Sequence, residues 1–132
     1  MSVFQFRLDG SSGVPPYLQL VQQVRQGLLL GHLRSGDQLP TVKEVVASLA
    51  INPNTVVKAY RQLEHEGMVN ARPGQGTFIT ASIEPVAPGP YARLRHSLEQ
   101  WVRDAHAAGL DDETVTAMFA SVHSELRTEG AA

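Results

Sequence analysis

Residues 39–78 of this 132-residue chain read LPTVKEVVASLAINPNTVVKAYRQLEHEGMVNARPGQGTF. Near the start of this stretch, Thr41 is followed three residues later by Glu44, which is the pattern of a capping box at a helix N-terminus. The apolar residues that follow have helical spacing, and we expect a short helix that ends near Ala50.

A second helix is predicted directly after the first. Asn52 is a favoured N-cap, and Pro53 suits the first helical position, where its missing N–H costs nothing. Gly67 stands where a left-handed C-terminal cap is wanted. Since only two or three residues separate the two helices, they must meet at a sharp angle, as in a helix-turn-helix.

The remainder of the stretch has the pattern of a β-hairpin. Residues 68–71 and 77–80 are predicted as strands, and Pro73-Gly74-Gln75-Gly76 closes the turn between them. A hairpin in this place is the wing beside a helix-turn-helix. We therefore expect a mostly α fold with a small β-hairpin, which is a winged helix-turn-helix domain.

This order of elements indicates a DNA-binding unit. The second helix of a helix-turn-helix enters the major groove with its N-terminal residues at base edges. Here its exposed face is polar at the start and basic further along. A helix N-terminus and a glycine-rich turn suit close approach to phosphates. The predicted DNA-contacting residues are Thr41, Lys43, Asn52, Pro53, Asn54, Thr55, Val57, Lys58, Arg61, Arg72, Gln75, Gly76 and Thr77.

Simpler interpretations remain open for parts of this set. Asn52 could serve only as a cap, although a cap uses one side-chain oxygen and is compatible with base contact. Lys58 and Arg61 could form an ordinary solvated face, and the glycine-rich turn could close an ordinary hairpin. The order of the elements within forty residues, rather than any single residue, favours DNA binding.

The charges are unevenly distributed along the chain. The net charge of −2 alone argues against a nucleic-acid binder. However, residues 1–82 carry seven Lys/Arg and five Asp/Glu, a net of +2, whereas residues 83–132 carry four and eight, a net of −4. Only the N-terminal part has the sign expected of a phosphate-facing surface.

The segments before and after this unit are also patterned. Phe4, Phe6 and Leu8 alternate with polar residues and predict a short strand or an extended arm, and a helix is expected over residues 17–31. Residues 84–90 contain three prolines, so residues 83–90 are predicted to be a semi-rigid linker without regular structure. The expected domains are thus a DNA-binding domain at 1–82, this linker, and a helical segment at 91–132.

The C-terminal segment is predicted to contain two helices with apolar stripes. Gly109 ends the first helix, and Asp111 is the expected N-cap of the second. We expect the stripes to be buried between two copies of the chain. The predicted dimer-interface residues are Leu94, Leu98, Trp101, Val102, Val115, Met118, Phe119, Val122 and Leu126.

Enzyme chemistry has little support in this sequence. The chain has no cysteine, and its five histidines lack HExxH or comparable ligand spacing. No nucleophile-elbow pattern occurs. We therefore expect no catalytic residues, no metal and no cofactor, and the lack of a signal-peptide pattern makes a cytoplasmic location the expectation.

Several short motifs in combination carry a family resemblance: PYLQL at 16–20, GDQLPTVKE at 36–44, NPNTV at 52–56 and GQGTF at 74–78, with Ala59-Tyr60, Leu63-Glu64 and Glu66-Gly67 between them. The chain resembles the GntR family of bacterial transcription regulators, and within it the short YtrA-like subfamily. The resemblance implies a homodimer that binds a palindromic operator, usually as a repressor, with a C-terminal two-helix segment for dimerisation. Such regulators are often encoded beside transporter genes, which implies autoregulation of an operon that contains a transporter.

Two positions depart from the pattern of the family. Lys43 stands where the family often has an arginine that touches DNA, and lysine keeps the charge but loses the bidentate fork. Val57 stands where the family more often has a polar residue that contacts bases, and valine offers only apolar contact. Both departures indicate a shifted operator preference.

A second class of function also remains open. The C-terminal helix pair could bind a protein partner or an unidentified small-molecule effector. Only about fifty residues follow the wing, so we expect any effector pocket to form at the dimer interface.

Overall fold

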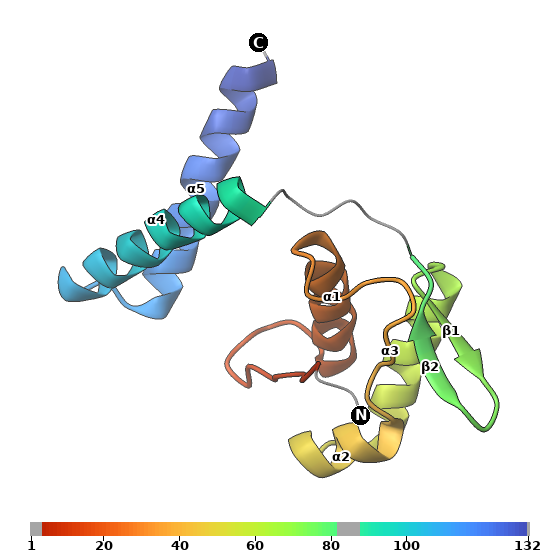
Figure 1. Ribbon diagram of the computed structural model, residues 1–132. Coiled ribbons are helices and arrows are strands. Elements are labelled where there is room, and N and C mark those ends of the chain that lie inside the picture. Colours follow the sequence, from red (N-terminus) through yellow and green to blue (C-terminus); the bar gives the residue numbers. More distant parts are fainter. Residues whose placement is uncertain (1–3, 82–87, 132) are drawn as a thin grey trace. The chain divides into compact units, whose positions relative to one another are not determined.

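The computed structural model describes residues 4–81 and 88–131, and the chain divides into two compact units, residues 1–86 and 87–132. Five helices and one antiparallel hairpin are formed in the described ranges, which confirms the mostly α fold with a winged helix-turn-helix and C-terminal helices (Figure 1). The elements are α1 (Pro16–Leu29), α2 (Val42–Leu49), α3 (Pro53–His65), β1 (Val69–Arg72), β2 (Gly76–Ile79), α4 (Pro88–Ala107) and α5 (Asp112–Ala131).

The predicted capping box at the start of α2 is confirmed. Thr41 Oγ1 accepts a hydrogen bond from the Glu44 backbone N–H at 3.1 Å, and the Glu44 carboxylate accepts one from the Thr41 N–H at 3.3 Å. The helix ends at Leu49, and its C-cap residue Ala50 adopts the left-handed conformation with φ 54°. This conformation is uncommon for a residue with a Cβ, and it makes the connection to α3 tight.

The predicted start and end of α3 are confirmed as well. Asn52 Oδ1 accepts a hydrogen bond from the Asn54 N–H at 2.8 Å, and Pro53 is the first helical residue. After the helix, Gly67 takes φ 78°, the left-handed region in which glycine pays no steric penalty. Local signals within three or four residues therefore define both ends of α3.

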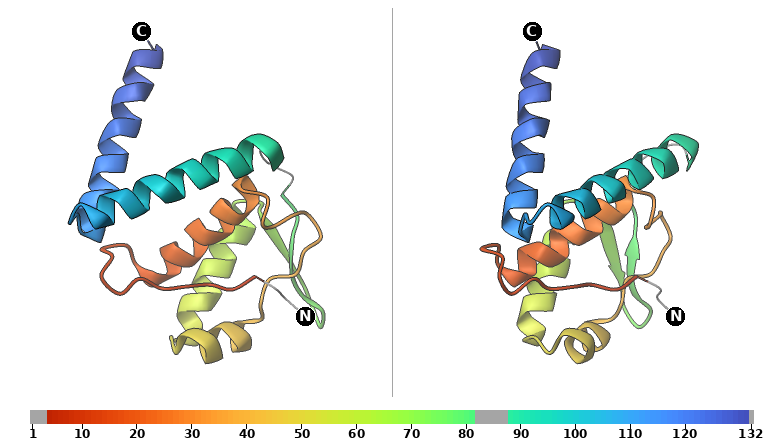
Figure 2. Two further views of the ribbon diagram at one scale, coloured as in Figure 1. Left: turned by 60° about the vertical axis from the view of Figure 1, so that its left-hand side comes forward. Right: turned by 90° about the vertical axis from the view of Figure 1, so that its left-hand side faces the viewer.

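The core of the first unit lies where α1 packs against α3, and α2 and β1 also pack against α3 (Figure 2). Each large apolar side chain that is fully buried there contributes about 1.5–3 kcal/mol relative to its exposed state. The largest fully buried side chains are Leu20, Val21, Val24, Leu39, Val56, Leu63 and Ile79.

The predicted hairpin forms, but both of its strands lie one residue nearer the turn than predicted, with the pairing register unchanged. β1 pairs with β2 from Val69↔Ile79 to Arg72↔Gly76. Gly76 enters the ladder because it adopts φ 129°, which a residue with a Cβ rarely does. The outer edge of β2 is covered by residues 36–39, whose backbone exchanges hydrogen bonds of 2.8–2.9 Å with Thr77 and Ile79.

Residues 4–8 form the extended arm that was one of the two expected alternatives. Two glutamines of α1 hold it. The Gln23 amide accepts from the Arg7 N–H at 2.8 Å and donates to the Arg7 carbonyl at 2.6 Å, and Gln19 accepts from the Asp9 N–H at 2.9 Å. Phe6, which is 6% exposed, is the arm residue that enters the core.

The second unit begins earlier than the linker prediction allowed. α4 starts at Pro88, so the assignment of residues 88–90 to a linker without regular structure was wrong. Proline is tolerated in the first turn of a helix, where backbone N–H groups have no intrahelical partner. The remaining linker positions, residues 83–87, lie outside the described residues.

The two helices of the second unit diverge from a short connection (Figure 2). Gly109, with φ 93°, follows α4, and Asp111 caps α5 by accepting from the Thr114 N–H at 2.8 Å. Ala105 and Val115 are buried, whereas six large apolar side chains are 42–59% exposed: Leu94, Leu98, Met118, Phe119, Val122 and Leu126. Within the described ranges, no helix has the length and apolar character needed to cross a membrane.

Candidate nucleic-acid interface

Helix α3 has two faces of opposite character. Val56, Ala59 and Leu63 are 0% exposed, and Tyr60 is 8% exposed. The opposite face is a shallow concavity lined by Asn54, Val57, Lys58, Arg61, Gln62 and His65. The helical period places the buried and the outward residues on opposite sides, so a polar and basic surface is displayed by a helix that is fixed from behind.

At the start of α3, the predicted contact residues are presented together. Asn52, Pro53 and Asn54 are exposed, while Thr55 is partly buried, as is Val57 two residues later. The Asn52 side-chain oxygen is already occupied by the cap. The Asn54 side chain does not cap the helix, so of the two asparagines it is the one available for base contact.

The two cations of the exposed face have different surroundings. The Lys58 ammonium lies 4.0 Å from the centroid of the Tyr17 ring, a cation–π contact that the sequence did not reveal. Arg61 is exposed, and it forms no ion pair with the other residues that the structure describes. Lys58 is thus oriented by α1, whereas Arg61 projects without such a contact.

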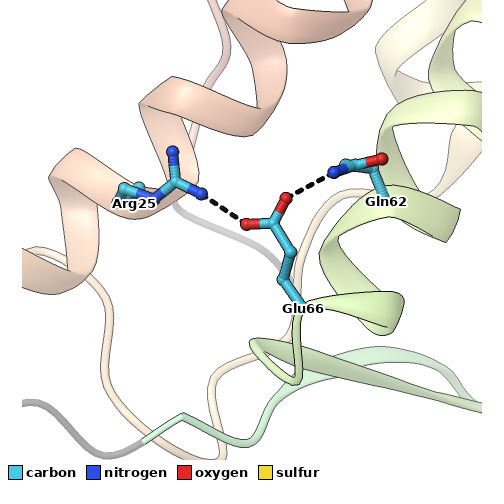
Figure 3. A network of polar contacts seen from close by, with 3 residues as sticks. All are labelled: Arg25, Gln62 and Glu66. Atoms are coloured by element: carbon cyan, nitrogen blue, oxygen red, sulfur yellow. Dashed lines mark hydrogen bonds and ion pairs between the residues drawn. The ribbon is translucent and has the colours of Figure 1, made fainter.

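The acidic residues at the end of α3 are engaged within the fold. Glu66 accepts from Arg25 of α1 and from the Gln62 amide at 2.6 Å (Figure 3). Glu64 accepts from the Ala71 backbone N–H at 3.0 Å. These contacts tie the end of α3 to α1 and to β1, and they partly satisfy two carboxylates that would otherwise repel a phosphate.

A second concave surface joins α2 and the wing. It is lined by Thr41 and by residues 71–77, so the structure brings the first cap of the helix-turn-helix beside the wing turn. Lys43, two residues after Thr41, is exposed. In the wing, the Arg72 guanidinium lies 4.4 Å from the centroid of the Phe78 ring, and Gln75 is exposed at the turn. Gly76 and Thr77 are partly buried.

A buried tyrosine links α3 to the segment that precedes α2. The Tyr60 hydroxyl donates to the Pro40 carbonyl. Burial raises the pKa of Tyr60 above its usual range, and the negative charge of Glu44 raises it further. Tyr60 therefore remains a neutral donor at physiological pH and ties α3 to the segment that leads into α2.

Sequence reasoning missed several residues of this surface. Gln62 and His65 follow Asn54 at helical spacing and could have been found by extending the stripe by two turns. Tyr17 and Gln38, which contact Lys58 and the wing turn, lie 41 and 37 residues from those partners, and no local pattern pairs them. Within residues 4–81 and 88–131, no three metal-ligating side chains lie together.

In the second unit, the predicted dimer-interface residues differ in exposure. Six are exposed, and Trp101 and Val102 are partly buried. Val115 is only 9% exposed in the single chain. Its burial is therefore already achieved within the unit and does not depend on a second copy.

Comparison with known proteins agrees with this geometry. Residues 16–79 match the family described as bacterial regulatory proteins, gntR family. The chain is 33% identical over 122 residues to the HTH-type transcriptional repressor YtrA of Bacillus subtilis (strain 168), covering 92% of this chain and 94% of that protein. It is similar to the structure of a transcriptional antiterminator from Listeria monocytogenes EGD-e, with a TM-score of 0.59 and 28% identity over 92% of each chain. It is also similar to YtrA from Sulfolobus acidocaldarius, a GntR-family transcription factor, with a TM-score of 0.54 and 26% identity over 77% of this chain and 97% of that one. The chain therefore belongs to the gntR family of bacterial regulatory proteins.

Proposed function

We propose that the chain is a sequence-specific DNA-binding transcriptional regulator that acts as a homodimeric repressor on a palindromic operator. The observation that carries this proposal is the two-faced α3, whose outward face is polar and basic while its other face is buried. No cofactor is required for such a function.

In this proposal, α3 lies in the major groove. The Asn54 amide can pair with an adenine edge, and the methyl groups of Thr55 and Val57 can meet a thymine methyl group. Lys58 and Arg61 contact phosphates along the groove. Residues that contribute phosphate contacts set the register but carry no sequence information directly.

The beginning of α2 and the wing provide a second set of backbone contacts. Thr41, Arg72 and the turn that contains Gln75 line one concavity, and Lys43, two residues after Thr41, is exposed. Asn52, Pro53, Gly76 and Thr77 complete the proposed contact set. Lysine at position 43 offers one strong point charge in place of a bidentate fork, so the operator differs from those of relatives that have arginine there.

The dimer is supported by the exposed apolar side chains of α4 and α5. Six of them are 42–59% exposed in the single chain, and large apolar side chains at adjacent helical positions are typical of an interface. A second copy of the chain presents the same surface, which suits a two-fold symmetric contact. In the dimer, the second copy would also cover Trp101 and Val102. Val115 would stay buried within each copy, near the connection between α4 and α5.

Repression is proposed because the Bacillus subtilis relative is named as a repressor. We further propose that the chain represses transcription of its own operon, and that this operon contains a transporter gene. A cytoplasmic location follows from action on the chromosome.

DNA binding is tested with the purified full chain and two labelled duplexes, one from upstream of its own gene and one with the same composition in scrambled order. We expect the specific duplex to bind in the range of about 10⁻⁸–10⁻¹¹ M at physiological salt, at least ~10³-fold tighter than the scrambled one. Affinity should fall steeply as salt is raised. Equal affinity for the two duplexes would refute sequence-specific binding.

A further inference from the structure

Gln38 connects the wing turn to the segment that leads into α2. Its side chain is partly buried, and its Nε2 donates to the Gln75 carbonyl at 3.1 Å. Gln75 is an exposed residue of the turn, and Thr41 follows Gln38 by only three residues. A single side chain therefore links the two halves of the concavity described above.

The base of the wing and its turn are held in different ways. At the base, residues 36–39 bond to β2 through backbone groups, and Gln38 forms a bridge with Phe78. The turn lies beyond Arg72↔Gly76, the last pair of the ladder. Among the described residues, the Gln38 amide provides the one hydrogen bond between residues 73–75 and the chain outside the hairpin.

Gly76 provides the space that this amide occupies. A Cβ at position 76 would come within 2.5 Å of Gln38 Nε2, which is closer than real Cβ contacts. The φ of 129° already favours glycine at this position. Glycine at position 76 therefore permits the positive φ and also leaves room for the Gln38 amide.

We propose that Gln38 is a positioning residue that fixes the wing turn relative to the N-terminus of α2, so that both engage the DNA backbone as one unit. Gln38 itself contacts no base in this proposal, which rests on the proposed DNA-binding function. Without its hydrogen bond, the turn moves independently of α2, while α3 keeps its contacts with the bases.

The test compares Gln38→Met, which keeps the length of the side chain but lacks the donor, with Gln26→Met at an exposed position of α1. Two readouts are used: hydrogen exchange of the free protein, and hydroxyl-radical footprinting with an affinity titration on the specific duplex. For Gln38→Met we expect faster exchange in residues 74–77 and 5- to 10-fold weaker binding. Protection should be lost at the flanks contacted by the wing and retained at the centre of each half-site. Gln26→Met should match the wild type in both.

The proposal is overturned if exchange in residues 74–77 is unchanged in Gln38→Met. It is equally overturned if exchange rises throughout the first unit, or if protection is lost uniformly, since both results mean a general structural role. If the wild type itself binds no duplex specifically, the proposed function fails, and the exchange measurement still decides whether Gln38 positions the turn.

A double-mutant cycle gives a second, independent check. Gly76→Ala should raise exchange at the turn strongly in the wild type, because the new methyl group displaces the Gln38 amide and also strains the backbone. In Gln38→Ala only the strain remains, so the added effect of Gly76→Ala should be smaller. Equal effects of Gly76→Ala in the two backgrounds would contradict the contact.

Discussion

Arg61 and Lys58 lie three residues apart on the exposed face of α3, but of the two only Lys58 has an aromatic partner among the residues that the structure describes. We predict that Arg61→Ala weakens binding to the specific duplex about 10-fold and lowers the slope of log affinity against log salt by about one, because one phosphate contact is lost. Anisotropy titrations over a series of salt concentrations measure both quantities.

Arg103→Ala is the matched control for this prediction. Arg103 lies on α4, where its guanidinium is 3.9 Å from the Glu99 carboxylate and its side chain is 66% exposed. This substitution should leave the salt slope unchanged. Indistinguishable slopes for the wild type and Arg61→Ala would show that Arg61 makes no phosphate contact.

Leu63 shows how the same helix is held from its other side. Its side chain is 0% exposed within the core of the first unit. We predict that Leu63→Ala lowers the free energy of unfolding by about 2–5 kcal/mol, since it removes buried methyl groups and leaves a cavity. Urea denaturation followed by circular dichroism checks this value. The neighbouring exposed substitution Arg61→Ala should change stability by no more than about 0.5 kcal/mol, and a comparable loss there would contradict the two-faced description of α3.

At the scale of the elements, the N-terminus of α5 is capped by a titratable group, the Asp111 carboxyl. Hydrogen bonds from Thr114, from its side chain first and then from its backbone, lower the pKa of Asp111 below its usual value. Because the folded-state pKa is depressed, this stabilisation is present above the unfolded pKa of about 3.9 and is lost as the pH falls through the folded pKa. The helix start therefore weakens only under acidic conditions.

We predict that Asp111→Asn, which keeps the capping oxygen but removes the titrating carboxyl, reduces the acid sensitivity of α5. The measurement is the backbone chemical shift of residues 112–115 between pH 6 and about pH 2.5, a range that spans the carboxyl titration. Glu113→Gln, another acid in the first turn, is the control, and its Thr114 amide should keep the wild-type acid response, because that N–H donates to the Asp111 carboxylate. An unchanged acid response in Asp111→Asn would mean that the cap does not control this end.

The starts of α2, α3 and α5 were predictable because their signals are local. Thr41 with Glu44, Asn52 with Pro53, and Asp111 each act within three residues, so the sequence alone contains the pattern. The limits of the hairpin strands were predicted less well. Both strands lie one residue nearer the turn than predicted, and Gly76, with φ 129°, forms the last pair of the ladder.

The contacts that orient the interface were not predictable in the same way. Gln23 pairs with the backbone of Arg7, 16 residues away, and Gln38 pairs with Gln75, 37 residues away. A glutamine has no preference for one distant carbonyl until the fold brings the two together. The sequence therefore revealed which face of α3 is displayed, but not how the arm and the wing turn are held.

At the scale of the whole molecule, the net charge divides the chain into a basic N-terminal and an acidic C-terminal part. The acidic part presents the exposed apolar stripe proposed as the dimer contact, and Phe119, 48% exposed, lies on it. We predict that Phe119→Glu yields a monomer, because a charge would have to be buried at the interface. Sedimentation velocity at micromolar concentration measures the change, and operator affinity should fall with it.

Ser124→Glu is the control for charge alone. Ser124 is exposed on α5, five residues from Phe119 and on the opposite side of the helix. This variant should remain dimeric. A wild-type protein that sediments as a monomer would exclude the homodimer, and the apolar stripe would then be assigned to a different partner.

The most direct measurement is hydroxyl-radical footprinting of the full chain on the duplex from upstream of its own gene. We predict two protected half-sites related by two-fold symmetry and spaced by about one helical turn, with protection that is lost in Asn54→Ala and Arg61→Ala. Absence of protection, or equal protection of the scrambled duplex, would contradict the conclusion that the outward face of α3 recognises DNA.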